Sequence, residues 1–529
     1  MERVRSWWMA GVLLLAAVLL LANLGRPRMW QDEAETALLG RNTLRFGVPK
    51  VWDGLNLVTQ SYAFDFDRHL LFQKPWLPIY AVAASFAVLG EGTARARLPF
   101  AVCGLLTVYL TWRVGSRLSG DRAVGALGAL LLTVSLPFVL YARQCRWYAL
   151  AMALTLLLVE GEDRLDEPRG WLWFGLPAAL LFHVNYLTLA VTLAGLLAGR
   201  LWTRGGRRAV SRNLVKGVLV LGAAALPWWI AFPPFAFAAE SAGAGLADLP
   251  RRVAWLFSDF NRYLLPLPAV VILLAVLGRD LLRQAWFRRM GAMFLLAVPL
   301  SAVPLWTGLI TVIGFRYVVN LLPVAALLFA AVLRGATRRR PWLLALLLAV
   351  HLATHALGFP LSLWPPFTTG ILRTDLLELR RAVFAPPRGP IDGAVEFLQA
   401  QARPGQALFT PYEHLPYQFY TGLRTAGVPR VGTLLRRLDL ALPEYVSTFI
   451  LGDVDWIVPR AKWEGFLGAP PTGRLVQILR EQGLDVEEHV LDAPDFEWQC
   501  REYPPLNPFT DDPGVPRLRV LRVVGGPRP

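Results

Sequence analysis

Two adjacent carboxylates, Asp32 and Glu33, follow an apolar run that extends from Trp7 to Leu24. An ionised side chain near the hydrocarbon boundary of a membrane is costly unless it faces protein or water, so such acids are functional candidates. A carboxylate beside an attacking hydroxyl can act as a general base. The two acids can also cap the helix predicted for AETALLGRNTL, because acids favour a helix amino terminus. The two roles are compatible.

Three basic residues in separate segments could form an anion-binding site with this acidic pair. Lys74 lies in FQKPWLP, Arg146 in YARQCRWY and Arg316 in GFRYVVNLLP. Arginine forks and lysine point charges are the groups that recognise phosphate. Each one alone could instead extend toward lipid headgroups. Their presence together with the acids favours a site for a phosphate.

Further side chains near these segments are candidate substrate contacts: Arg143, Tyr148, His183 and Tyr317. A lone histidine at a helix end is more often structural than a metal ligand or a substrate contact. Both interpretations of the histidine stay open here.

Two patterns could hold a metal ion. His351 and His355 stand four residues apart on one helix face, but no acid accompanies them at a helpful spacing, so we expect packing or an interhelical hydrogen bond. Asp65 and Asp67 in DFDRH resemble the pair that holds a metal-bound nucleotide sugar in cytoplasmic transferases. If Asp65 and Asp67 lie on an outer loop, no nucleotide sugar reaches them. We then expect them to bind an acceptor or to stabilise the loop. No cofactor is predicted, although a divalent metal ion stays possible.

The elements that must position these residues are those of a polytopic helical membrane protein. The 529 residues are 55% hydrophobic and 17% charged, and the apolar residues fall in blocks of about 15 to 20. The net charge of +16 does not indicate nucleic acid, because the basic residues lie in short clusters between apolar blocks. The three cysteines are far apart in the sequence, so they imply neither a disulfide framework nor a metal site. The blocks predict about 11 spans, near 7–24, 98–117, 123–141, 147–160, 171–183, 186–200, 214–232, 264–278, 291–306, 317–333 and 341–363.

The basic clusters predict the orientation of these spans. Most arginines of the short connections lie on one side when the amino terminus is inside, which is the arrangement that the positive-inside rule favours. We therefore expect a multi-pass protein of the cytoplasmic membrane, with its candidate residues and its C-terminal region outside. If segment 75–90 crossed the membrane, every later connection would lie on the opposite side and the arginine clusters would be outside. We expect a re-entrant or interfacial helix there, with a span as the alternative.

A soluble domain is predicted after the last span. Residues 1–364 form the transmembrane module with a large first outer loop at 25–97, residues 365–388 form a Pro-rich linker, and residues 389–529 form an outer α/β domain with alternating helices and strands. Glu413, His414 and Tyr417 follow a predicted strand, where ligands often bind. They could bind an acceptor, or they could have a supporting or assembly role.

The order of five segments resembles glycosyltransferase family 39, over residues 1–340. These segments are WQDEAETALLGRNTLRFGVP, QKPWLPIY, GEGTARARLPFAVCGLLTVYL, YARQCRWYAL and FRYVVNLLPVAALL. The family belongs to the GT-C class of membrane sugar transferases and is related to the protein O-mannosyltransferases and to the aminoarabinose transferase of lipid A. The acidic pair, the KP motif and the RLP motif are specific only in combination.

The resemblance implies a sugar donor carried on a polyprenyl monophosphate and transfer with inversion. Asp32 matches the catalytic aspartate of the family, and Lys74 matches its phosphate-contacting lysine. Relatives close to the aminoarabinose enzyme carry Glu before that lysine, whereas this chain has Gln73, which puts an inherited metal site in doubt. A lipid-linked donor also fits an outward-facing site, because nucleotide sugars are confined to the cytoplasm.

The sequence therefore predicts an inverting transferase that acts on an outer protein, lipid or glycan. Asp32 would accept the proton of the acceptor hydroxyl while Glu33 orients it or holds the local charge, and Lys74, Arg146 and Arg316 would neutralise the leaving phosphate. The alternative is a carrier or flippase for a lipid-linked saccharide, which should carry charges within several spans and possibly an internal repeat. Neither pattern is evident. An inactive homologue that acts as a scaffold is a third possibility.

Overall fold

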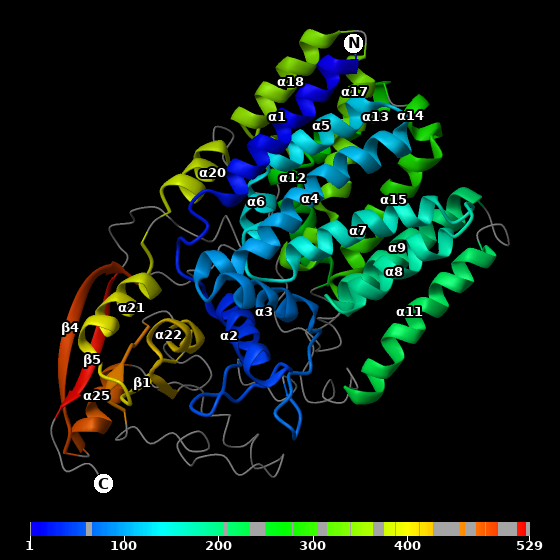
Figure 1. Cartoon of the computed structure of the whole chain (residues 1–529). Helices are drawn as coiled ribbons and strands as arrows, with labels where there is room; N and C mark the ends of the chain where they lie inside the picture. Colours follow the sequence, from blue (N-terminus) through cyan, green and yellow to red (C-terminus); the bar gives the residue numbers. More distant parts are fainter. Residues whose placement is uncertain are drawn as a thin grey trace. The chain divides into compact units, whose positions relative to one another are not determined.

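The chain forms two compact units in the computed structural model (Figure 1). The structure describes residues 2–59, 66–204, 210–232, 249–277, 279–303, 315–338, 340–362, 375–386, 388–411, 413–426, 454–460, 472–481, 483–495 and 516–524. Met1–Asn23 and Leu98–Ala385 form the helical unit. Leu24–Arg97 and Pro386–Pro529 form the mixed unit. The first loop therefore belongs to the same compact unit as the C-terminal segment.

The described residues of the helical unit contain helices and no strand. Four of its helices are long and apolar enough to cross a membrane, and two bent pairs raise the possible number to six among the described residues. Each predicted span overlaps a helix, but several of these are short, so the number of spans stays a prediction. The helices are α1 (Glu2–Leu21), α4 (Thr93–Ser119, which begins in the mixed unit), α5 (Arg122–Thr133), α6 (Leu136–Ala142), α7 (Tyr148–Asp163), α8 (Gly170–Phe182), α9 (Tyr186–Arg204), α11 (Arg212–Ala231), α12 (Leu249–Tyr263), α13 (Leu267–Leu277), α14 (Arg279–Arg283), α15 (Ala285–Leu300), η3 (Phe315–Tyr317), η4 (Val319–Leu321), α17 (Leu322–Thr337), α18 (Pro341–Ala353), α19 (Phe359–Ser362) and α20 (Asp375–Phe384).

The span predicted near 123–141 is broken in the structure. Helices α5 and α6 meet at an angle of 71°. Pro137 lies in the first turn of α6, where its missing N–H costs nothing, whereas inside a continuous helix the proline ring would clash with the preceding turn. The turn before it closes with a hydrogen bond from Ser135 N to Leu132 O of 3.1 Å.

Buried ion pairs join the ends of three helices in the helical unit. Glu162 of α7 accepts hydrogen bonds of 2.8 Å from both Arg200 of α9 and Arg289 of α15. The Arg200 side chain is 1% exposed. A buried carboxylate that loses its partner is strongly destabilising, so these arginines, which the sequence indicated only as topology signals, also fix the packing of α7, α9 and α15.

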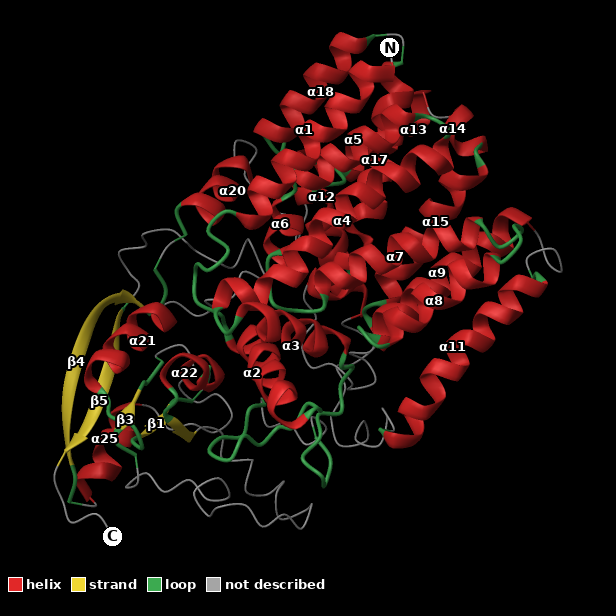
Figure 2. Ribbon diagram, viewed as in Figure 1, coloured by secondary structure: helices red, strands yellow, loops and turns green. Residues whose placement is uncertain are grey.

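The mixed unit is built on a five-stranded sheet in the order β2-β1-β3-β5-β4 (Figure 2). Strand β1 is parallel to β2 and β3, while β5 is antiparallel to β3 and β4. The predicted alternation of helices and strands is confirmed, except that the three-residue strand β2 was not predicted. The elements are α2 (Gln31–Phe46), α3 (Leu77–Leu89), α21 (Pro390–Gln401), β1 (Ala407–Phe409), α22 (His414–Thr421), β2 (Arg424–Ala426), β3 (Trp456–Ile457), α25 (Thr472–Glu481), β4 (Asp485–Pro494) and β5 (Arg517–Val524).

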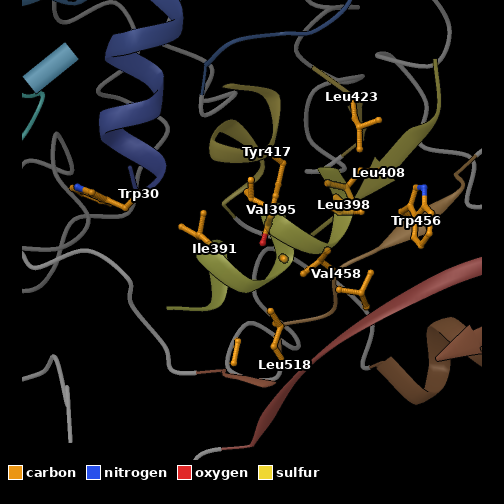
Figure 3. Close-up of a cluster of buried hydrophobic side chains, with 13 residues drawn as sticks. Trp30, Ile391, Val395, Leu398, Leu408, Tyr417, Leu423, Trp456, Val458 and Leu518 are labelled. Carbon is orange, nitrogen blue, oxygen red and sulfur yellow. The ribbon is translucent and has the colours of Figure 1, made fainter. Parts of the chain in front are cut away.

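Helices cover both faces of this sheet. Leu408 packs with α21 and α22 residues, whereas its neighbour Phe409 packs with Leu479 of α25, as expected because successive strand residues point to opposite faces. The core on the α21 side also contains Trp30, which directly precedes α2 (Figure 3). The indole is 3% exposed. The first loop and the C-terminal segment therefore share one apolar core.

Helix α3 packs closely on α2. A Cβ atom added at Gly40 of α2 would lie 2.7 Å from Val82 Cγ1, so the two helices touch where α2 has no side chain. Thirteen residues of helix extend only about 20 Å, less than the roughly 30 Å of a bilayer core. This length agrees with the interfacial or re-entrant helix predicted for 75–90, which stays a prediction.

Helix α22 holds the first turn of α2. Gln31 Oε1 accepts a hydrogen bond of 3.1 Å from Leu415 N, and Gln31 Nε2 lies 3.3 Å from His414 Nδ1. The other ring nitrogen of His414 lies 3.3 Å from the carbonyl oxygen of Thr59. The ring is buried, and burial lowers the pKa of His414 from 6.5 to about 4, although the bond to Thr59 acts in the opposite direction.

We predict that Gly40→Ala destabilises the protein. A methyl group overlapping Val82 costs about 1–3 kcal/mol, more than the roughly 1 kcal/mol that Ala contributes in a helix. The thermal unfolding midpoint in detergent should fall, and adding Val82→Ala should restore part of it. Gly222→Ala on α11, where a Cβ atom meets nothing within 4 Å, is the matched control. An equal response of the two glycines would contradict the close packing.

We also predict that His414 makes stability depend on pH. The unfolded histidine binds a proton as the pH falls through 6.5, whereas the folded one does so only near 4. Its contribution is therefore complete above pH 6.5 and is lost as the pH falls toward 4, with about 2 kcal/mol lost at pH 5. The unfolding midpoint should fall less between pH 7.5 and pH 5 in His414→Gln than in the wild type. Equal decreases would refute the prediction.

Candidate active site

Asp32 and Glu33 lie in the first turn of α2, and both are buried. The sequence predicted that they precede and cap a helix, but α2 already begins at Gln31. Its N-cap is Trp30, which makes no side-chain cap hydrogen bond. The acids lie instead where the helix dipole stabilises negative charge. The helix begins early because α22 holds Gln31 and the sheet core holds Trp30.

Arg97 neutralises Glu33. Arg97 Nε donates to Glu33 Oε1 at 2.7 Å and Arg97 Nη2 donates to Oε2 at 2.6 Å. The same guanidinium donates to the carbonyl oxygens of Leu24 and Pro27. Bidentate pairs of this kind are strong and directional. The sequence analysis did not name Arg97 as a site residue, although it lies in the RLP motif.

Lys74 lies in the same mixed unit, three residues before α3. Its Nζ is 5.5 Å from the centroid of the Phe72 ring. The segment is closed by a hydrogen bond of 2.6 Å from Trp76 Nε1 to Phe72 O. This hydrogen bond fixes the conformation of the loop that carries Lys74.

Five other candidates lie in two segments of the helical unit. Arg143, Arg146 and Tyr148 lie in one segment, and Arg316 and Tyr317 lie in the other. Tyr141 contacts both segments. The ring of Tyr141 is 4.9 Å from that of Tyr148 and 6.3 Å from that of Phe315, which precedes Arg316. The structure therefore brings the two segments together. Arg143 donates to Leu19 O at 2.6 Å, which satisfies a carbonyl in the last turn of α1.

His183 follows the last residue of α8 and packs among aromatic rings. Its ring centroid lies 5.1 Å from that of Phe182 and 5.6 Å from that of Trp228 on α11. These contacts give His183 a packing role between α8 and α11. A role in substrate binding stays a prediction.

The candidate metal patterns give no metal cluster in the described part of the chain, where no three His, Cys, Asp or Glu side chains could hold an ion together. His355 does acquire an acidic neighbour that the sequence spacing did not reveal, with its Nε2 3.4 Å from Asp375 Oδ1. His351 packs on Phe329. Asp67 instead accepts hydrogen bonds from His69 N and Leu71 N in a turn, and Asp65 lies outside the described residues.

Glu413, His414 and Tyr417, which the sequence places after a predicted strand, make buried contacts within the mixed unit. Glu413 and Asp495 both pair with Arg460, whose side chain is fully buried. His414 contacts Gln31 and Thr59 as described, and Tyr417 lies in the sheet core. These contacts favour the supporting role over acceptor binding.

We predict that Arg97→Met destabilises the protein by about 3–5 kcal/mol, because Glu33 would remain buried without a counter-charge. The double variant Glu33→Gln/Arg97→Met should recover part of this loss. Arg95→Met is the matched control, since Arg95 is exposed on the same helix and its loss should change stability by less than about 0.5 kcal/mol. Thermal unfolding in detergent measures all three. Similar midpoints for Arg97→Met and Arg95→Met would contradict the buried pair.

One family model matches part of the chain. Residues 73–230 match the model of a family described as dolichyl-phosphate-mannose-protein mannosyltransferase. No curated protein matches the chain.

Two crystal structures of ArnT share the fold of the chain. A crystal structure of ArnT from Cupriavidus metallidurans bound to undecaprenyl phosphate is 14% identical, with a TM-score of 0.55 and coverage of 99% of each chain. The apo structure of the same protein has the same identity and TM-score and covers 99% of this chain and 98% of that one. An oligosaccharyltransferase from Archaeoglobus fulgidus is 12% identical over 93% of this chain and 75% of its own, with a TM-score of 0.49. The resemblance seen in the sequence is confirmed: residues 73–230 match the family model, and the chain shares the fold of ArnT.

Proposed function

We propose that this chain transfers a sugar, with inversion, from a polyprenyl-phosphate donor to a hydroxyl acceptor at the outer face of the cytoplasmic membrane. The observation that carries the proposal is the buried acidic pair at the start of α2, in which Arg97 holds Glu33 through both carboxylate oxygens. The family match supports the class of reaction. The ArnT structure with undecaprenyl phosphate supports the class of donor, because its fold is shared.

The two acids have different roles in this proposal. Both oxygens of Glu33 accept from Arg97, so its charge is committed to a structural pair and it is a poor base. Asp32, its neighbour in the same turn, is then the general base. Glu33 and Arg97 hold the local charge and the start of the helix, which refines the role that the sequence suggested for Glu33.

The reaction is a single displacement at the anomeric carbon. The acceptor oxygen attacks that carbon, its proton passes to the Asp32 carboxylate, and the bond from the carbon to the phosphate oxygen breaks. The polyprenyl phosphate leaves with one more negative charge than it carried in the donor. Fixed cations stabilise such a charge most in a dry, preorganised site. We assign this role to Lys74, Arg146 and Arg316.

We predict that Asp32→Asn lowers the rate of sugar transfer by about 10²- to 10⁴-fold, the usual contribution of a general base. Purified full-length protein would be incubated with polyprenyl-phosphate sugars and extracted envelope acceptors, and the glycosylated product measured. Lys74→Met should also lower the rate. Glu91→Gln is the control, because Glu91 is an exposed partner of Arg41 in the same unit.

Equal rates for wild type and Asp32→Asn would remove Asp32 as the base. If neither protein transferred sugar, and the wild type moved the lipid-linked sugar across the membrane of reconstituted vesicles, the transferase proposal would fail in favour of a carrier.

A further inference from the structure

The hydrogen bonds around Gln31 have only one consistent set of donors and acceptors. Leu415 N–H can only donate, so the Gln31 atom that receives it is the amide oxygen. The amide nitrogen of Gln31 must then donate to Nδ1 of His414. The His414 Nε2 atom consequently carries the proton and donates to Thr59 O. One neutral tautomer of one histidine thus connects α2 to the loop at Thr59.

The same loop residue also reaches the next turn of α2. Thr59 Oγ1 donates to Glu35 Oε1 at 3.1 Å. Gln31 and Glu35 are four residues apart and share one face of the helix. His414 and Thr59 are therefore joined to two successive turns of α2 on one side, and all four residues are buried.

Asp32 lies between these two fixed points. Its own backbone is tied within the helix, where Thr36 Oγ1 donates to Asp32 O at 3.2 Å. The other end of α22 is held as well, because Tyr420 Oη accepts a hydrogen bond of 2.8 Å from Met29 N and lies 2.7 Å from Thr93 Oγ1. A helix turn that is held on both sides of a residue fixes the direction of that residue's side chain.

We propose that His414 is a positioning residue for the transfer reaction: through Gln31 and Thr59 it fixes the first turn of α2 and so directs the carboxylate of Asp32. The inference rests on the proposed function of Asp32. It gives the C-terminal segment a specific task, because α22 supplies the imidazole ring that joins Gln31 to Thr59. A base displaced by a fraction of an ångström loses rate even when the fold survives.

Three substitutions separate the two hydrogen bonds of the ring. His414→Asn retains an acceptor near the Nδ1 position and so keeps the bond from Gln31. His414→Gln retains a donor near the Nε2 position and so keeps the bond to Thr59. His414→Phe keeps the ring volume and loses both bonds. Val395→Ala is the control, because Val395 is buried in the core that contains Trp30 and Tyr417 and its apolar side chain can make no hydrogen bond.

The experiment measures kcat and the donor KM of the full-length protein for each variant, together with its unfolding midpoint. We expect kcat to fall about 10- to 30-fold in His414→Phe, the loss of two hydrogen bonds of ordinary strength, with the donor KM changed less than twofold. His414→Asn should recover part of kcat, because Gln31 adjoins Asp32. Val395→Ala should lower the unfolding midpoint and leave kcat near the wild-type value.

Two outcomes would overturn the inference. In the first, Val395→Ala and His414→Phe have the same unfolding midpoint and lose kcat equally. The loss in His414→Phe would then follow from lower stability alone. In the second, kcat is unchanged in His414→Phe.

Hydrogen exchange keeps this test separate from the proposed function. If the wild type transfers no sugar with any donor, the proposed function fails, but the positioning can still be measured. Exchange of the amides of residues 34–36 should then accelerate in His414→Phe and not in Val395→Ala. Unchanged exchange would overturn the positioning role by itself.

Discussion

The mixed unit depends on the burial of one indole ring. Trp30 comes from the first loop, yet its neighbours in the core come from α21, α22 and the strands β1, β3 and β5. Burying a large aromatic side chain is among the most favourable single steps in folding. Because Trp30 directly precedes α2, the same burial fixes where that helix begins. Gln31 and the acidic pair directly follow this anchor, and Arg97 donates to Glu33 after it and to Pro27 before it.

Among the described residues, arginine and not lysine supplies the buried cations that pair with buried acids. Glu33, Glu162 and Glu413 each pair with an arginine that is almost fully buried. A planar guanidinium can satisfy both oxygens of a carboxylate and stays ionised when buried, whereas a lysine readily loses its proton there. Only Lys50, Lys74, Lys216 and Lys462 among the basic residues of the chain are lysines.

Local patterns in the sequence were sufficient for the class of protein and for much of its secondary structure. Apolar blocks predicted the helices, alternation predicted the strands, and the motifs around Asp32 and Lys74 predicted the family. What the sequence could not reveal depends on contacts between distant residues. Arg97 is separated from Glu33 by 64 positions, so nothing in its own segment indicates a partner. The acid beside His355 is likewise brought there by α20, and the shared core of Trp30 requires knowledge of the tertiary fold.

The separation between Gln31 and His414 has a consequence for biosynthesis. The two residues are 383 positions apart, and a ribosome that adds about 5–20 residues per second needs roughly 20–80 s to make the chain between them. During that interval the nascent α2 lacks the partner of its first turn, while the helices of the helical unit are already emerging. A prematurely terminated chain would contain every acid and cation of the candidate site and still lack the ordered start of α2. Synthesis of α22 is thereby coupled to the ordering of the first turn of α2.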